Sequence, residues 1–409
     1  MDGQYFRWYK RVEPATATAF LIAMRNIFIG IFVGVVLGIV LGATVIAPRL
    51  KQQQEPIAEA DVERVAEPED PRDVAMQLSK GLLVRPAVQL KLASAYSSAT
   101  PVLGALAQRV GSEVWRVSNG RVQINFHEPD TLAPVADMFD AVASSAIDAA
   151  FSSPGMWGDD LPAANLFGAI PFGPSVDEYL AWIYFGGGKR LLEDLYSKRG
   201  VHGIICGMTG PPGFGWFRDE INTPEALEGV RMLINGLGAK VVERLGVEPQ
   251  QLSGGAIFSA LETGQLDAVA YSMPVVDLNL GFQEFLKNYY FPGWQQPAIL
   301  LELIVNIDKW QSLDDGQQAQ IEAVCGDNIR YGIAESEASQ FAALKQLYAE
   351  GVRLHRWPDP VQDALKEAWE EVAAQQAGTD SDFRAIWRSL KAFRTEYAIW
   401  SELSELRQP

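Results

Sequence analysis

The chain has 409 residues, of which 48% are hydrophobic and 21% are charged, proportions typical of a globular protein with a sizeable core. Its formal net charge of −17 argues against a nucleic-acid partner, because binding to a polyanion requires clustered lysine and arginine. The cysteines, Cys206 and Cys325, are too few and too far apart for a disulfide framework or a cysteine-rich zinc site, so they leave the redox compartment open.

Residues 27–47 form an uncharged apolar stretch that is long enough, as a helix, to cross the roughly 30 Å hydrocarbon layer of a membrane. Basic residues precede this stretch and acidic residues dominate soon after it, so the positive-inside rule places residues 1–26 in the cytoplasm and the rest of the chain on the other side. A cleaved signal peptide is the alternative, but its apolar core is usually shorter, and Pro48 directly after Ala47 disfavours cleavage. We expect one uncleaved transmembrane helix.

Glycine recurs at every fourth position of this stretch, at Gly30, Gly34, Gly38 and Gly42. Residues with this spacing share one face of a helix, where glycine leaves a groove that allows a second helix to approach closely. The alternative is that glycine is simply commoner in membrane helices than in soluble ones. Three overlapping GxxxG pairs favour packing against another membrane helix, from a second copy or from a partner.

Residues 48–87 are rich in Gln, Glu, Asp and Pro, a composition typical of a spacer. From residue 88 onward, strand-like runs such as VQINF and IDAAF alternate with helical patterns, and one long helix is predicted over residues 175–198. This alternation predicts an α/β fold with a largely parallel sheet.

A second alternating set begins at GFGWF and ends with the strand AILLELIVNI, after which the chain is mostly helical. Two such sets and a helical tail are the outline of a two-lobed binding protein with its ligand in the crevice at the strand ends. The predicted boundaries are about 88–210 with part of 303–350 for lobe I, about 211–302 for lobe II, and 359–409 for the C-terminal helices.

No motif indicates catalysis or a metal site. The histidines, His127, His202 and His355, are isolated in sequence and have no second ligand at helical or hairpin spacing. Residues 186–189 read GGGK but lack the other residues of a phosphate-binding loop, and the sequence has no nucleophile elbow and no HExxH. We therefore expect no enzyme activity, no catalytic residue, no metal and no cofactor.

Residues 213–282 and 288–306 carry a set of more specific motifs. These are a Gly-Trp-Phe-Arg strand, a Gly-Leu-Gly helix start, Gly-Gly before a helix ending in Ala-Leu-Glu, and Tyr-Tyr-x-Pro-Gly-Trp. Together they resemble the 2-oxo-acid-binding branch of the solute-binding proteins of tripartite ATP-independent periplasmic (TRAP) transporters, and the resemblance runs from about residue 88 to the C-terminus. It implies two lobes, a long helix that spans them, a C-terminal helix that can swap in a dimer, and delivery of a small carboxylate to a separate permease.

The sequence departs from this family at the ligand positions. The arginine that normally pairs with the ligand carboxylate aligns with Leu233, although Arg231 lies two residues before it, on the same strand face. The glutamine that supports the metal aligns with Pro212, and the acidic and aromatic pair aligns with Ala270 and Tyr271. Alanine and proline have no side-chain oxygen to offer a cation.

The resemblance leaves a short set of candidate ligand-binding residues: Arg218, Arg231, Tyr96, Trp216 and Tyr271. Arg218 has two open interpretations, because it either binds an anion or pairs with a nearby acid such as Asp219 or Glu220. The loss of one charged hydrogen bond to a ligand costs about 2 to 3 kcal/mol, so we expect weak binding of ordinary 2-oxo acids.

Two functions account for these departures. In the first, which we favour at this stage, the chain is an accessory or scaffold subunit, anchored in the inner (cytoplasmic) membrane and docked by its periplasmic domain onto a larger integral membrane complex. In the second, it is a working TRAP receptor with changed specificity for a small, more apolar organic acid, and it serves TRAP permease subunits. The resemblance also implies that a second copy of the chain is a possible partner, in a homodimer.

Overall fold

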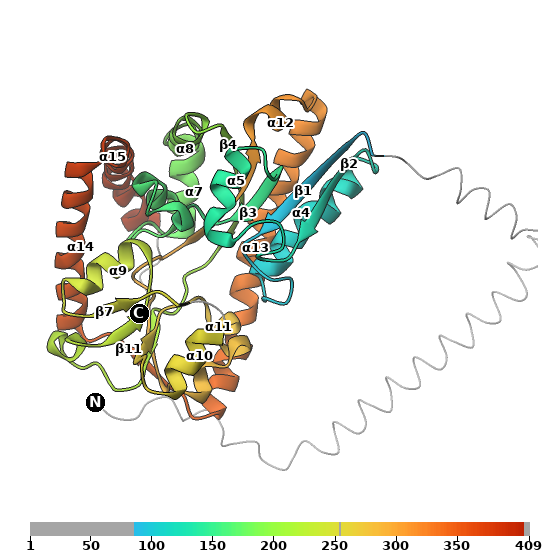
Figure 1. The fold of residues 1–409 in the computed structure, drawn as a ribbon. Coiled ribbons are helices and arrows are strands. Elements are labelled where there is room, and N and C mark those ends of the chain that lie inside the picture. The colour runs from blue at the N-terminus through green and yellow to red at the C-terminus, as the bar shows by residue number, and fades with distance from the viewer. Residues whose placement is uncertain (1–85, 253–254, 405–409) are drawn as a thin grey trace, which may run out of the picture. The chain divides into compact units, whose positions relative to one another are not determined.

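The computed structural model describes residues 86–252 and 255–404 (Figure 1). The predicted cytoplasmic segment, the predicted membrane helix with its glycines and nearly all of the predicted spacer lie outside these residues. Within the described ranges, no helix combines the length and the apolar character needed to span a bilayer.

Five strands form the first sheet in the order β2-β1-β3-β10-β4. Their bounds are β1 (Val88–Ser94), β2 (Val122–His127), β3 (Ala149–Ser152), β4 (Val201–Thr209) and β10 (Ile299–Asn306). β1 pairs in parallel with β2 and β3, whereas β10 is antiparallel to both of its neighbours. Every residue of β10 is buried, as expected for a strand between two others that is covered on both faces.

The helices around this sheet are α4 (Leu103–Val117), α5 (Met138–Ala143), α6 (Asn165–Gly168), α7 (Val176–Phe185), α8 (Gly188–Ser197) and α12 (Ile307–Gln311). Short 3-10 turns join them at η2 (Val135–Asp137), η3 (Pro154–Trp157) and η4 (Pro162–Ala164). The single helix predicted over residues 175–198 is wrong, because the chain breaks between α7 and α8 at Gly187, which has a φ of 92°. That left-handed conformation is open to glycine and ends a helix.

Six short strands form the second sheet in the order β11-β9-β5-β8-β6-β7. Their bounds are β5 (Gly215–Phe217), β6 (Arg231–Leu233), β7 (Glu248–Gln250), β8 (Ala268–Val269), β9 (Asn288–Phe291) and β11 (Arg353–Arg356). Only β5 runs against its neighbours. Around the sheet lie η5 (Pro224–Leu227), α9 (Gly236–Glu243), α10 (Gly255–Glu262), α11 (Pro274–Leu280) and η6 (Phe282–Glu284).

Three long helices complete the chain: α13 (Asp315–Ala349), α14 (Asp359–Thr379) and α15 (Ser381–Ser404). α13 starts with a capping box between Asp314 and Gln317. Its 35 residues contact β4 of the first sheet, α4 beside that sheet, and α11 beside the second sheet (Figure 1). α14 packs against α9, and α15 packs against α7 and α8. The predicted two-lobed α/β fold with a helical C-terminal tail is thus confirmed.

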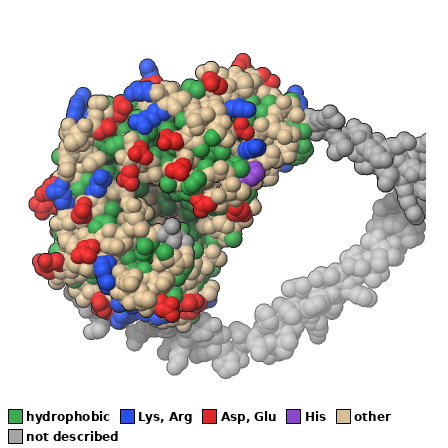
Figure 2. Space-filling view, in the orientation of Figure 1, with side chains coloured by type: hydrophobic (Ala, Val, Ile, Leu, Met, Phe, Trp, Pro, Cys, Tyr) green, Lys and Arg blue, Asp and Glu red, His purple; other side chains and the backbone are tan. Residues whose placement is uncertain are grey.

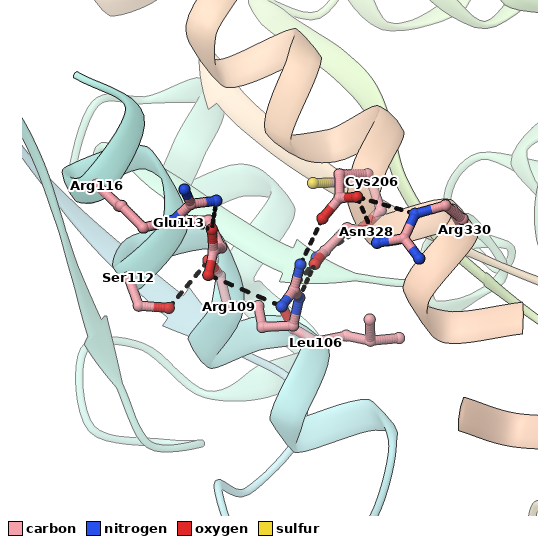
Figure 3. A network of polar contacts seen from close by, with 9 residues as sticks. Leu106, Arg109, Ser112, Glu113, Arg116, Cys206, Asn328 and Arg330 are labelled. Atoms are coloured by element: carbon pink, nitrogen blue, oxygen red, sulfur yellow. Dashed lines mark hydrogen bonds and ion pairs between the residues drawn. The ribbon is translucent and has the colours of Figure 1, made fainter. Parts of the chain in front are cut away.

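A disulfide between Cys206 of β4 and Cys325 of α13 joins the long helix to the first sheet. Beside it, Asn328 donates to the carbonyls of Leu106 (3.0 Å) and Cys206 (3.2 Å) and accepts from Arg109 Nε at 3.0 Å. Figure 3 shows this network next to the sulfur of Cys206, with the Arg109 side chain directed from α4 toward α13. The first half of α13 is therefore fixed to β4 by a disulfide and a hydrogen bond, and to α4 by further hydrogen bonds.

Candidate functional site

The two sheets meet at the carboxyl ends of their parallel strands. We call the first sheet with its helices lobe I and the second lobe II. One connection runs from the end of β4 to the start of β5, and another runs from the end of β9 to the start of β10, so these strand ends face one another. Ligands bind at such edges in α/β folds. Figure 2 shows that the molecule is hollowed in the middle of this face, between the part that carries α5 and the part that carries α11.

Two tyrosines, one from each lobe, follow strands that end at this cleft edge. Tyr96 follows β1, with its ring centre 6.3 Å from that of Phe151, and Tyr271 follows β8, 5.5 Å from Phe282. The pKa of Tyr96 is raised well above its usual range. Burial is the main cause, and Tyr271 and the carboxylate of Glu302 add to the shift. Because Tyr271 is 46% exposed, its ring remains available to a ligand. The structure therefore places two of the predicted aromatic residues at the cleft edge, one in each lobe.

The third predicted aromatic residue, Trp216, has no exposed surface. It forms a hydrogen bond with the buried side chain of Asp277. Its Nε1 donates to Asp277 Oδ2 at 2.9 Å, the hydroxyl of Tyr289 donates to the same oxygen at 2.8 Å, and the backbone N–H of Ser272 donates to Oδ1 at 3.1 Å. Burial raises the pKa of Asp277 to about 7, although these hydrogen bonds oppose the shift. Asp277 follows Tyr271 by a few residues, so lobe II carries a carboxyl group directly beneath the cleft edge.

Lobe I carries a second buried carboxyl group, Glu302 of β10. Its Oε1 accepts from Trp157 Nε1 at 2.7 Å and from Ser152 Oγ at 3.2 Å. Burial raises the pKa of Glu302 to about 7. Neither acid is among the residues predicted from the sequence, although each is a single charged residue within an apolar run. Such acids are rarely buried unless they have hydrogen-bond partners.

The structure does not bring the two predicted arginines to the cleft edge. Arg231 begins β6 and forms a bidentate ion pair with Asp267, with N–O distances of 2.7 and 2.8 Å. Arg218 follows β5, which is antiparallel, and donates to the carbonyls of Leu261 (2.8 Å) and Leu266 (3.1 Å). Both side chains therefore lie at the end of the lobe II sheet that is remote from lobe I, and the acidic partner of Arg231 is Asp267.

The three positions that are predicted to depart from the family pattern lie in lobe II or next to it. Leu233 is 3% exposed and packs in the core with Trp216, while Pro212 is buried in the connection between the lobes. Ala270 is half-buried and its backbone N–H donates to the carbonyl of Leu233 at 2.8 Å. None of these side chains offers an oxygen to a cation.

Two of the three histidines have side-chain contacts in the structure. The ring of His202 stacks on Trp310, with centroids 4.3 Å apart, and His355 Nε2 lies 3.0 Å from Asn288 Oδ1. Burial and the charge of Lys189 lower the pKa of His202 to about 4. Among the residues that the structure describes, no three His, Cys, Asp or Glu side chains are grouped so that they could hold a metal ion.

Two lobes joined by paired crossings, with aromatic side chains at the shared cleft edge, define a solute-binding protein. Residues 92–379 match the family model described as bacterial extracellular solute-binding protein, family 7, and the chain belongs to this family. Members of this family bind ligands and are not enzymes, in agreement with the expectation from the sequence.

Similar solved structures are solute-binding proteins of TRAP transporters. A monocarboxylate 2-oxoacid-binding periplasmic protein of Nostoc sp. is 30% identical over 300 residues, which are 73% of this chain and 82% of that protein. A TRAP solute-binding protein of Bordetella bronchiseptica, a mixed occupancy dimer with calcium and picolinate, has a TM-score of 0.75 at 30% identity and covers 78% of this chain and 95% of its own. One from Pseudoalteromonas atlantica, with sodium and pyruvate, has a TM-score of 0.74 at 29% identity and covers 77% and 96%. The predicted family is confirmed.

Proposed function

We propose that this protein is a TRAP-type solute receptor that binds a small molecule between Tyr96 and Tyr271. The observation that supports this most directly is that Tyr96 follows β1 and Tyr271 follows β8, two inner strands whose carboxyl ends face one another. Aromatic rings on both sides of a cleft can enclose a small ligand and exclude water when the lobes close. The fold around the cleft has the two crossings and the long helix that such closure requires.

The partners in this proposal are the membrane permease subunits of a TRAP transporter. The described domain is periplasmic in this proposal, and the buried disulfide supports an oxidising compartment. From the sequence, residues 27–47 anchor the chain in the inner membrane as a single span, with residues 1–26 in the cytoplasm. A homodimer is part of the proposal because the Bordetella bronchiseptica relative is described as a dimer.

Thermal unfolding of the full chain in mild detergent, with a panel of small solutes, tests the receptor. A ligand at a hundred times its dissociation constant adds about 2.7 kcal/mol to the free energy of unfolding. Tyr271→Ala should remove that gain, whereas Tyr348→Ala, at an exposed tyrosine of α13, should keep it. If Tyr271→Ala responds like the unmodified chain, the ligand does not bind between the tyrosines.

A second candidate function is that of an accessory or scaffold subunit of a larger membrane complex. It is supported by the apolar residues at Leu233, Pro212 and Ala270, and by the engagement of Arg218 and Arg231 away from the cleft. In this case the full chain should co-purify in mild detergent with an integral membrane complex, and the double substitution Gly34→Leu with Gly38→Leu should abolish that association. Purification of the unmodified protein alone would count against the scaffold.

A further inference from the structure

A pocket of about 380 Å³ lies beside the two connections that join the lobes. This volume is within the range of small-molecule sites, at its lower end. We call it the hinge pocket, and its lining comes from the connection after β4, from the end of β9 with the connection that follows, and from β11: Pro211, Pro212, Phe291, Pro292, Leu354, His355 and Arg356.

The hinge pocket and the cleft edge lie on opposite sides of the two connections. In the order of the lobe II sheet, β9 and β5 carry the connections and stand between β11 and β8. β11 lines the hinge pocket, whereas β8 leads to Tyr271 at the cleft edge. Three strand spacings, or roughly 14 Å, separate β11 from β8. The hinge pocket is therefore a second concave site, distinct from the cleft.

The apolar wall of the hinge pocket is assembled without a ligand. The two connections touch each other beside it, because a Cβ on Gly293 would lie 2.5 Å from the carbonyl oxygen of Pro212. The backbone N–H of Phe214 also donates to the carbonyl of Tyr290 at 2.9 Å. Proline fixes its own φ angle, so a wall that contains Pro211, Pro212 and Pro292 loses little conformational freedom when a ligand binds.

The charge at the hinge pocket is positive. Among the described residues, those that line it include the guanidinium of Arg356 and no carboxyl group. Arg356 is exposed and forms no ion pair within residues 86–252 and 255–404. Successive side chains of a strand point to opposite faces, so Leu354 and Arg356 share one face of β11. Arg353 is on the other face, where it pairs with Glu220 at 2.8 Å.

His355 adds no second positive charge, because lobe II already holds its ring. The amide nitrogen of Asn288 donates to the carbonyls of Phe217 (3.4 Å) and Arg218 (3.0 Å), so its Oδ1 accepts from His355 Nε2 at 3.0 Å. The ring also stacks on Tyr290, with centroids 4.8 Å apart. Burial is the main cause of a lowered pKa of His355, so the ring is neutral at neutral pH.

β11 offers backbone donors beside the guanidinium. It is the outermost strand of its sheet and pairs only with β9, in parallel. The N–H groups of Arg353 and Trp357 donate toward β9 at 2.8 and 3.1 Å. In a parallel pair the N–H groups of alternate residues point the same way, so those of Leu354 and Arg356 point off the sheet edge. Backbone N–H groups and a guanidinium are the donors that suit a carboxylate.

The other cavity of similar size has no such charge preference. It measures about 360 Å³, lies between α9 and α14, and is lined by Lys240 and Arg244 but also by Glu243. Arg244 pairs with Glu371 at 3.6 Å and donates to the side-chain oxygen of Gln375. Acids and acceptors of the protein thus already engage this cavity.

From these observations we infer that the hinge pocket is a second ligand site, for a small organic anion with an apolar end, such as an aryl carboxylate. The carboxylate pairs with Arg356 and the outer N–H groups of β11, and the ring packs on Phe291, Leu354 and the prolines. Such a ligand contacts both connections between the lobes. The site does not depend on the solute that the cleft takes.

Calorimetric titration of the full chain in mild detergent tests the inference with three probes: phenylacetate, phenylacetamide and acetate. Phenylacetamide keeps the shape without the charge, and acetate keeps the charge without the ring. Phenylacetate should bind about tenfold more tightly than either of the others. Equal affinities for phenylacetate and phenylacetamide, or no binding of phenylacetate, would overturn the inference.

Matched variants locate the bound phenylacetate. Arg356→Gln should weaken its binding about tenfold, whereas Arg199→Gln, at an exposed arginine of lobe I, should leave it unchanged. Leu354→Ala is a second variant that shortens the apolar wall, and it should weaken binding about threefold. Tyr271→Ala, at the cleft edge, should have no effect on phenylacetate. Binding that is lost in Tyr271→Ala but kept in Arg356→Gln would place phenylacetate in the cleft, which would overturn the inference while the proposed receptor function stands.

Discussion

Breaking the disulfide between Cys206 and Cys325 should destabilise the protein by several kcal/mol. The two cysteines are 119 residues apart, and both are buried without exposed surface. In the chain-entropy description, closing a loop of this length lowers the entropy of the unfolded chain by about 16 cal/mol/K, which corresponds to about 5 kcal/mol at 25 °C. Reduction leaves the thiols in place, so it removes this term without creating a cavity.

Urea unfolding followed by circular dichroism, with and without a reductant, measures this term. With an m-value of about 3 kcal/mol/M, the midpoint should fall by more than about 1 M on reduction. The double variant Cys206→Ala with Cys325→Ala is the control, because its midpoint should be low and should not respond to reductant. Coincident curves for the oxidised and reduced protein, or two free thiols in the protein as purified, would refute the reasoning.

Two further predictions concern the cleft edge. Gly104→Ala should cost about 1 to 3 kcal/mol and weaken solute binding, because a Cβ there would lie 2.0 Å from the carbonyl oxygen of Ser97, in the loop after Tyr96. Gly326→Ala, on an open face of α13, should instead be neutral or stabilising in the same thermal unfolding assay, and equal effects at both positions would contradict this account. Asp277 has a pKa of about 7 in the folded state, above its unfolded value of 3.8, so its contribution to stability is greatest below pH 4 and is lost as the pH rises through 7. The total loss is roughly 4 kcal/mol, of which about 2.5 kcal/mol falls between pH 5 and pH 8. Asp277→Asn should remove that part of the difference between urea unfolding curves at the two pH values, and an unchanged difference would show that Asp277 does not titrate there.

Much of the fold could be predicted from the alternation of strand-like runs and helical patterns. Runs such as VQINF became β2, and the apolar run of β10 became a buried central strand. β4 was missed because Gly203 and Gly207 interrupt its apolar pattern, and glycine is unfavourable in strands. The break at Gly187 was also missed, although GGG at residues 186–188 is a local signal for the end of a helix.

The candidate site was less predictable, because sequence spacing does not say which end of a strand a residue occupies in space. Arg231 and Leu233 are two residues apart, yet one begins β6 at the remote end and the other ends it at the cleft edge. Trp216 could be assigned to a strand, but only packing against Tyr289 and the hydrogen bond to Asp277 explain its burial. The disulfide depends on contact between β4 and α13, which are far apart in the sequence.

The disulfide also determines how the chain would behave after a protease cut. All of β5 to β9 lies between Cys206 and Cys325, so these five strands of lobe II belong to a closed covalent ring that starts and ends in lobe I. A single cleavage in an exposed loop between Cys206 and Cys325 would open this ring without separating the two products. The two fragments of the cleaved protein would remain covalently linked by the disulfide until a reductant broke it.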